Sequence, residues 1–156
     1  MQRLFMPFAV LALAIPATLL SACGGGDDEP GSDAEYVAAV CTTIGGLQAT
    51  LNDLGDELSG AETVDEISEA LDLFAAALND AAGDLDDARP PADVRDSHDA
   101  VVDAFREAAG AMADGNVEAL DAFDPGSIEP PATARQRLAA AAAQEPACQG
   151  LGIFEL

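Results

Sequence analysis

Apolar residues recur three and four positions apart over two long stretches of the chain, a spacing that predicts amphipathic helices. The first stretch follows the Ser-x-x-Glu capping box of Ser32 to Glu35 and ends at Ser59-Gly60. The second follows a similar box, Thr63 to Glu66, and ends before Arg89-Pro90-Pro91, because proline disfavours helical geometry in the residue preceding it. The apolar positions are Val37, Val40, Ile44, Leu47, Leu51, Leu54 and Leu58, and then Val64, Ile67, Leu71, Phe74, Leu78, Ala81 and Leu85. We expect two antiparallel helices joined by a short loop.

Two further helices are predicted downstream. Residues 92–113 carry the stripe Val94, His98, Val101, Phe105, Ala108 and Met112. A short helical turn around Val117, Leu120 and Phe123 precedes the turn signal Asp124-Pro125-Gly126, and residues 132–144 form a last helix with Leu138 as its large apolar residue. The tail residues that we expect to cover the end of the bundle are Leu151, Ile153, Phe154 and Leu156.

The composition fits closely packed helices better than sheets. Hydrophobic residues make up 49% of the chain, but aromatic residues only 4%, with no Trp, so the core is mostly Ala, Leu and Val. We therefore predict an all-α fold over residues 32–156. Its expected arrangement is an antiparallel four-helix-type bundle with a short extra helix.

The first 22 residues have the pattern of a secretory signal peptide. Arg3 gives a positive start, an apolar run follows, and the small residues Ser21 and Ala22 end it. The alternative is an uncleaved membrane-spanning helix, since the run from Leu4 to Ala22 approaches the roughly 20 residues that a bilayer requires. Pro7 and Pro16 and the lack of basic residues after the run argue against it.

Residues Leu20-Ser21-Ala22-Cys23 resemble the lipobox of bacterial lipoproteins. The resemblance implies cleavage before Cys23 and attachment of lipid to its thiol, with a plain secretory leader as the alternative. Two or more acyl chains give stable anchoring, whereas one binds a membrane only marginally. Residues 23–31 would then be a Gly- and Asp-rich tether, whose eight residues from Gly24 to Gly31 span roughly 15 Å as a flexible coil.

Once Cys23 is assigned to the lipid, Cys41 and Cys148 remain. An even pair in an exported domain predicts a disulfide, with two buried free thiols as the alternative. The bond would close a loop of 107 residues and join the first helix to the C-terminal tail.

The charge of the chain excludes one class of partner. From Cys23 onward it carries five arginines, no lysine and 29 acidic residues, a formal net charge of −24. Such a polyanion is repelled by nucleic-acid phosphates and by anionic lipid headgroups, and it attracts a loose atmosphere of cations. Nucleic acid is therefore excluded as a partner, whereas weakly held divalent cations are compatible with the sequence.

Ser97-His98-Asp99 contains the three residue types of a hydrolytic triad. Neighbours on a helix point about 100° apart, however, and do not form a hydrogen-bonded relay. His98 lies on the apolar stripe, so we expect a neutral imidazole with one hydrogen bond, in the core or at its boundary, rather than a metal or haem ligand. Met112 lies 14 residues away, about 21 Å along one helix, and does not share a metal with His98.

Aspartates gather around the end of the second predicted helix. Asp80, Asp84 and Asp87 share one flank, and Asp86, Asp93 and Asp96 follow closely. Carboxylate oxygens suit Ca²⁺ or Mg²⁺, but the ordered spacing of an EF-hand loop is missing, and a solvated acidic face is the preferred interpretation. Paired-carboxylate glycosidase chemistry lacks the aromatic platforms that sugars require.

These observations favour a lipid-anchored protein on the outer side of the cytoplasmic membrane or in the periplasm. We expect a non-enzymatic binding or envelope-interaction module with no cofactor, which acts through its acidic surface or a groove between helices. The alternative is a divalent-cation-binding lipoprotein that uses the aspartates between Asp80 and Asp96, and a third possibility is an exported helical hydrolase.

Overall fold

The computed structural model of the chain describes residues 29–116 and 123–154. The α-helices of these segments are α1 (Asp33–Gly60), α2 (Val64–Asp86), α3 (Arg95–Ala113) and α4 (Ala132–Ala142). Two short 3-10 helices lie on either side of α4, namely η2 (Pro125–Ser127) and η3 (Pro146–Cys148), and the described segments contain no strand. The all-α prediction is confirmed. The short helix predicted at Val117, Leu120 and Phe123 falls largely outside the described residues.

Both long helices begin at their predicted capping boxes. The Ser32 hydroxyl accepts a hydrogen bond from the Glu35 N–H, and the Glu35 carboxylate accepts one from the Ser32 N–H, each at 3.3 Å. Thr63 and Glu66 repeat this exchange ahead of α2, and Glu66 also accepts from the Glu62 N–H at 2.8 Å. These bonds satisfy backbone donors that a helix leaves free in its first turn, so they set the starting point of each helix.

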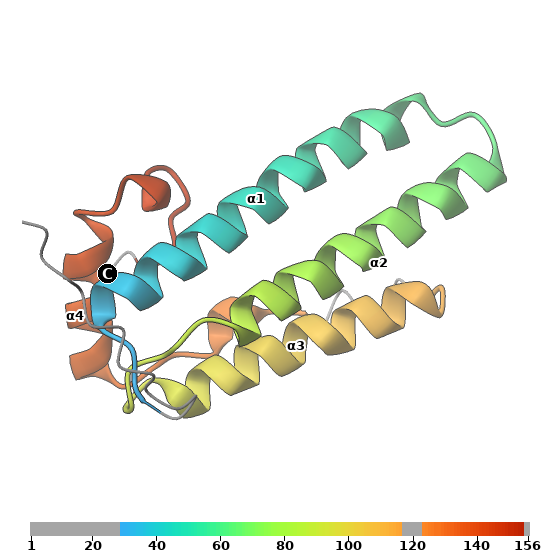
Figure 1. Cartoon of the computed structure of the whole chain (residues 1–156). Helices are drawn as coiled ribbons and strands as arrows, with labels where there is room; N and C mark the ends of the chain where they lie inside the picture. The colour runs from blue at the N-terminus through green and yellow to red at the C-terminus, as the bar shows by residue number, and fades with distance from the viewer. Residues whose placement is uncertain (1–28, 117–122, 155–156) are drawn as a thin grey trace, which may run out of the picture.

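Three long helices lie alongside one another, and the fourth sits at one end (Figure 1). α2 contacts both α1 and α3, whereas α4 and η3 contact α1. The group formed by α4 and the C-terminal residues lies at the beginning of α1. The turn between α1 and α2 is therefore at the opposite end of the molecule (Figure 1).

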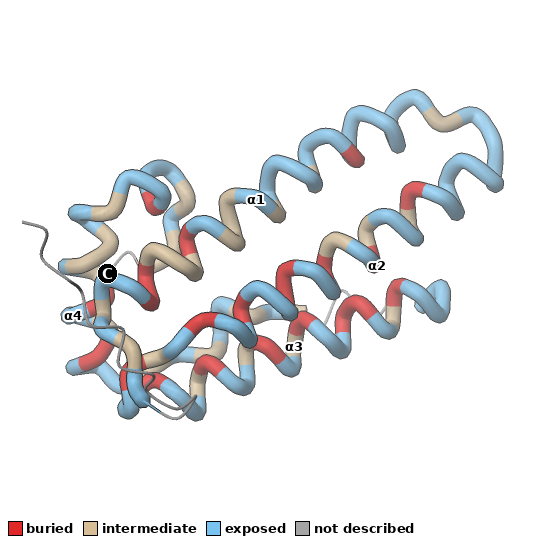
Figure 2. The backbone as a smooth tube through the Cα atoms, viewed as in Figure 1, coloured by how far each residue is buried: buried red, intermediate tan, exposed pale blue. Residues whose placement is uncertain are grey.

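The buried residues form two clusters. The larger cluster joins α2 to α3 around Leu78, Leu85, Val102, Phe105 and Met112, with part of α1 packed against it. The second joins the beginning of α1 to α4 around Val37, Leu138, Cys41 and Cys148. The tail residues Leu151, Ile153 and Phe154 are partly buried and pack on it, as the sequence predicts, and Leu156 lies outside the described residues. Figure 2 shows that burial decreases toward the α1–α2 turn.

The prediction that the apolar stripes are buried along their whole length is wrong at the end of the α1–α2 hairpin. Leu58, Val64 and Ile67 belong to these stripes, yet their exposed fractions are 40%, 81% and 43%. The reason is geometric, because α3 has 19 residues whereas α1 has 28, and α3 stops short of the turn (Figure 1). On α3 itself, Val102 and not Val101 is the fully buried valine.

Candidate functional site

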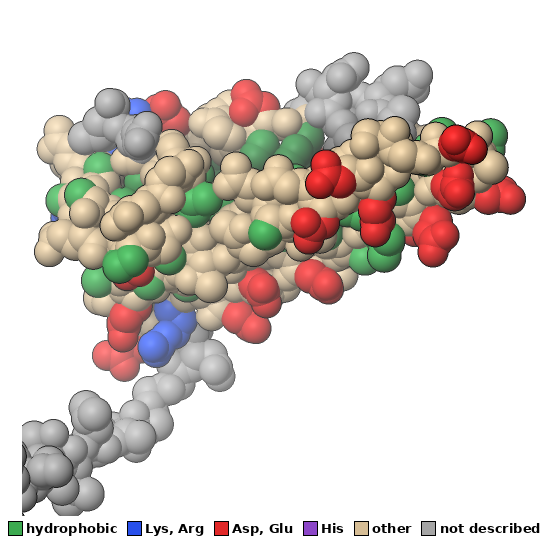
Figure 3. Space-filling model, turned by 90° about the horizontal axis from the view of Figure 1, so that it is seen from above, with side chains coloured by type: hydrophobic (Ala, Val, Ile, Leu, Met, Phe, Trp, Pro, Cys, Tyr) green, Lys and Arg blue, Asp and Glu red, His purple; other side chains and the backbone are tan. Residues whose placement is uncertain are grey.

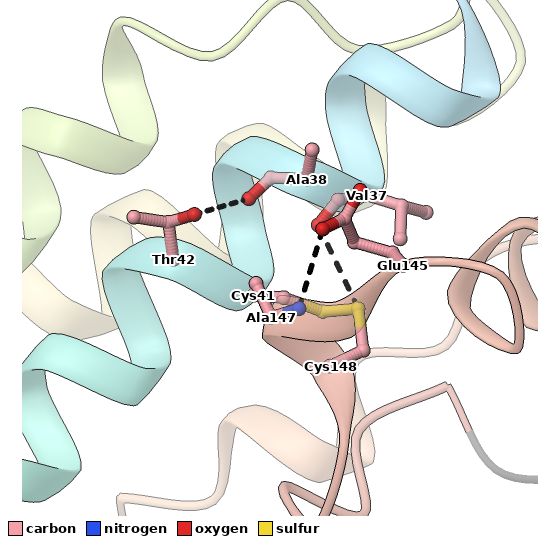
Figure 4. The surroundings of a disulfide bond; sticks show 7 residues. All are labelled: Val37, Ala38, Cys41, Thr42, Glu145, Ala147 and Cys148. Carbon is pink, nitrogen blue, oxygen red and sulfur yellow. Dashed lines mark hydrogen bonds between the residues drawn. A yellow bond between two sulfur atoms is a disulfide. The ribbon is translucent and has the colours of Figure 1, made fainter.

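A disulfide fastens the start of α1 to η3. It links Cys41 to Cys148 with their Cα atoms 5.0 Å apart, and both residues are buried. Figure 4 shows the bond between the two helices, next to the Val37 carbonyl oxygen, which lies 4.0 Å from the Cys148 sulfur. The pair is the one that the sequence predicts. It ties the first helix of the fold to the region that follows the last one.

Local hydrogen bonds position Cys148 for this link. The Glu145 carboxylate accepts from the Ala147 N–H at 3.2 Å (Figure 4). The Glu145 carbonyl accepts from the Cys148 N–H at 3.1 Å. Pro146 occupies the first position of η3, where its fixed φ fits a helical start and its missing N–H costs nothing. The short sequence Glu145-Pro146 thus turns the chain so that Cys148 faces α1.

His98 is buried beside Tyr36. Its Nδ1 lies 3.3 Å from the Tyr36 hydroxyl oxygen, and the two rings meet edge to face with centroids 5.5 Å apart. The predicted core imidazole with one hydrogen bond is therefore confirmed. Sequence reasoning missed its partner, because Tyr36 stands one position before the apolar stripe of α1. Tyr36 is the only tyrosine of the chain and follows the capping box directly, and this position was the feature of the sequence that could have indicated a specific role.

Burial changes the pKa of both rings in the direction that favours the neutral form. Desolvation lowers the pKa of His98, although the nearby carboxylates of Asp99 and Asp86 act in the opposite direction. Desolvation also raises the pKa of Tyr36 to about 12, with a further contribution from the negative charge of Asp99. Both side chains are therefore neutral near pH 7, and the pair packs as a polar but uncharged element of the core.

The structure does not bring Ser97, His98 and Asp99 together as a triad. The Ser97 hydroxyl donates to the carbonyl of Glu129 at 3.4 Å, while His98 turns inward to Tyr36. Asp99 is exposed and acts on the two rings through its charge alone. The three side chains leave α3 in different directions, as adjacent helical positions require.

Arg137 on α4 bridges two separate parts of the chain, an arrangement that the sequence did not indicate. Its guanidinium donates to Asp33 at the start of α1 at 3.0 Å and to both carboxylate oxygens of Asp93 at 2.9 and 3.0 Å. These charge-assisted bonds lower the pKa of Asp93 and raise that of Arg137. Through these two carboxylates, Arg137 holds α4 against the end of the molecule at which α1 begins.

The aspartates between Asp80 and Asp96 do not gather around one point. Asp86 pairs with Arg106 at 2.8 Å, and Asp93 belongs to the Arg137 bridge. Asp80, Asp84, Asp87 and Asp96 are exposed. Within the described residues no group of three or more acidic, histidine or cysteine side chains is arranged to hold a metal ion. This finding gives the cation-binding alternative no structural support.

Two hollows open on the surface near the disulfide-bonded end. One, of about 360 Å³, is lined by charges of both signs, including Arg89, Arg95, Asp99 and the edge of His98. The other, of about 380 Å³, is lined by α4 alanines together with Cys148, Gln149, Ile153 and Phe154. Neither combines a nucleophile, a base and a group that would orient them.

The charges are distributed unevenly along the molecule. No basic residue lies between Arg3 and Arg89, so every charged side chain of α1 and α2 is acidic. Figure 3 shows Asp and Glu side chains gathered over the end at which these two helices meet, with hydrophobic side chains among them. Among the residues that the structure describes, no carboxylate between positions 53 and 72 forms an ion pair. The α1–α2 turn is thus a concentrated negative surface.

The predicted lipidation site, Cys23, lies outside the described residues. In the part of the chain that is described, no helix has both the length and the apolar character needed to cross a bilayer. Comparison with protein-family models, with curated proteins and with solved structures finds no match to the chain. Its function must therefore be argued from its own residues.

Proposed function

We propose that the chain is a lipid-anchored protein of the cell envelope, a non-enzymatic binding module that presents its helical domain outside the cytoplasm. In this proposal residues 1–22 are a cleaved signal peptide, Cys23 carries the acyl chains, and residues 23–31 are the tether. The helical domain that follows is an antiparallel bundle closed by the disulfide. It sits on the outer face of the cytoplasmic membrane or in the periplasm.

The observation that carries the proposal is the buried Cys41–Cys148 disulfide. Disulfides persist in oxidising compartments and are rare in the cytosol. Pairing these two cysteines leaves Cys23 as the third, at the end of the apolar leader, where the lipobox resemblance calls for a lipidated thiol. The leader and the disulfide are independent features of the chain, and both point to export.

A binding role is favoured over catalysis by where the reactive side chains lie. The one histidine is packed in the core against Tyr36, and desolvation disfavours its protonation. The charged residues instead lie on the surface, and those of α1 and α2 are all acidic. A surface with one sign of charge steers partners of the opposite sign, so it serves association directly.

Mass spectrometry of the protein purified from its own membranes tests the anchor. We expect an amino-terminal residue 23 that carries acyl groups, and we expect Cys23→Ser to abolish both the acylation and the membrane association. The matched control is the double variant Cys41→Ala/Cys148→Ala, which should keep its acyl groups because it leaves the proposed lipidation site intact. An intact Met1 without acyl groups would refute the proposal.

A further inference from the structure

The end of the α1–α2 hairpin carries an apolar surface that no helix covers. Leu58 near the end of α1 and Ile67 in the first turns of α2 continue the stripes that are buried farther along these helices, and Val64 lies beside the turn. All three side chains are exposed to solvent. The only other large hydrophobic residue exposed to this degree in the described segments is Leu73, also on α2. We call Leu58, Val64 and Ile67 the hairpin tip.

Acidic residues surround the hairpin tip on both helices. Eight carboxylates lie between positions 53 and 72, namely Asp53, Asp56, Glu57, Glu62, Asp65, Glu66, Glu69 and Asp72. The structure pairs arginines with carboxylates elsewhere, such as Asp86 and Asp93, and with none of these eight. Exposed apolar side chains inside a rim of one charge sign match a partner with the same apolar character and the opposite charge.

The charges at the end of α1 add to this argument. Asp53, Asp56 and Glu57 lie in the last eight residues of α1, and no basic residue lies in its last turn. Negative charge there opposes the helix dipole and repels the acidic first turn of α2. A cationic partner would weaken both the unfavourable interaction with the dipole of α1 and the repulsion between the two helices. A second copy of the same surface would instead add further repulsion. The electrostatics therefore disfavour self-association through the tip.

The tip is also far from the proposed anchor. The 28 residues of α1 span about 42 Å at 1.5 Å per residue, and the tip lies at the opposite end from the first residues of α1 (Figure 1). A chain tethered just before α1 can therefore present the tip away from the bilayer. The tip is accessible to other proteins of the envelope.

We propose that the hairpin tip, Leu58, Val64 and Ile67 within its rim of carboxylates, docks a basic amphipathic segment of a partner protein. This inference deepens the proposed function and rests on the chain being a binding module. Apolar side chains of the partner cover the three residues, while its lysines or arginines face the rim. The apolar contact holds the complex together, and the charge speeds and orients association.

The full-length protein in phosphatidylcholine nanodiscs is suited to the test, with empty nanodiscs as the reference. The probe is a labelled synthetic helical peptide with leucines on one face and lysines on the other, and its binding is followed by fluorescence anisotropy. We expect Leu58→Ser/Ile67→Ser to weaken binding about tenfold or more, where tenfold corresponds to about 1.4 kcal/mol. Leu73→Ser is the matched control, because Leu73 is 48% exposed on the same helix but points about 120° around it from Ile67.

A second variant tests the charge without touching the apolar residues. Asp53→Asn/Asp56→Asn should weaken binding and reduce its salt dependence, and a peptide with glutamate in place of lysine should not bind. Each variant is checked for helicity by circular dichroism, and the charge variant decides the matter if the serine variant does not fold.

Several results would overturn the inference. They are an equal loss of binding in Leu73→Ser, equal binding of the glutamate peptide, or dimerisation of the wild type that the serine substitutions abolish. Saturable Ca²⁺ or Mg²⁺ binding that Asp53→Asn/Asp56→Asn removes would identify a cation as the occupant instead. Acylation of Cys23, measured on the same samples, shows separately whether the proposed anchor holds.

Discussion

Removing the disulfide is the most informative perturbation of this fold. Cys41→Ala/Cys148→Ala removes both cysteines of the bond, so that neither is left as a free thiol that could cross-link. The two residues are 107 positions apart. For a loop of that length the chain-entropy relation gives a loss of about 4.8 kcal/mol in the free energy of unfolding at 25 °C, and residual structure in the unfolded chain reduces it. Domains of this size are stable by about 5–15 kcal/mol, so the change is large.

Urea unfolding followed by far-ultraviolet circular dichroism measures this loss. The oxidised wild type, the reduced wild type and the double variant are compared at equal protein concentration. We expect the last two to unfold at similar, lower urea concentrations and with a larger m value, because an unfolded chain without the cross-link exposes more surface. Amide exchange should show lost protection in α1 and α4 together.

The opposite outcome is equally clear. If the double variant unfolds at the same urea concentration as the oxidised wild type, the disulfide does not restrict the unfolded chain in the way that loop closure requires. If only the amides beyond α4 lose protection, the bond fastens the tail and does not stabilise the fold as a whole.

Two further predictions concern single residues. Burial raises the pKa of Tyr36 to about 12, above the value of about 10 in an unfolded chain. Between about pH 10 and about pH 12 unfolding therefore releases the phenolic proton, and the stability that the buried phenol contributes is lost as the pH rises through this window. The ultraviolet titration of the only tyrosine should have its native midpoint well above that of the urea-unfolded chain, and equal midpoints would contradict a buried Tyr36. Gly31, the last residue of the proposed tether, packs against the helical domain, so a Cβ added there would clash with the backbone carbonyl of Arg89. A Cβ added at Gly55 on α1 meets nothing within 4 Å. Thermal melts should therefore show Gly31→Ala destabilised by about 1–3 kcal/mol and Gly55→Ala stabilised by about 0.5–1 kcal/mol, and equal effects would refute the steric argument.

The sequence predicted those features that depend on neighbouring residues. The starts of α1 and α2 follow from capping boxes in which residues three apart bond each other, and α2 ends close before Pro90 because of the restriction that proline imposes. The cysteine pairing was predictable for a different reason. Only two cysteines remain once Cys23 is assigned to the leader.

Features that depend on the relative placement of helices were not predictable. The spacing of apolar residues shows that Ile67 lies on the apolar side of its own helix. It does not show that α3 ends before reaching Ile67, which leaves that side chain exposed. The bridge from Arg137 to Asp33 and Asp93 joins residues 104 and 44 positions apart, and any of several acidic residues was an equal candidate. The contact of Tyr36 with His98 has the same origin, since it requires α1 and α3 to meet at one end.

The cross-link between the two ends of the fold also has a consequence for how the protein is made. Ribosomes add about 5–20 residues per second, so Cys148 is synthesised roughly 5–20 s after its partner, which is 107 positions earlier. During that interval the thiol of Cys41 lacks its native partner, and other thiols, including that of Cys23 until it is acylated as proposed, compete for it. The late arrival of η3 makes oxidative closure one of the last steps of maturation, and a translation pause before Cys148 would lengthen the period in which mixed disulfides form.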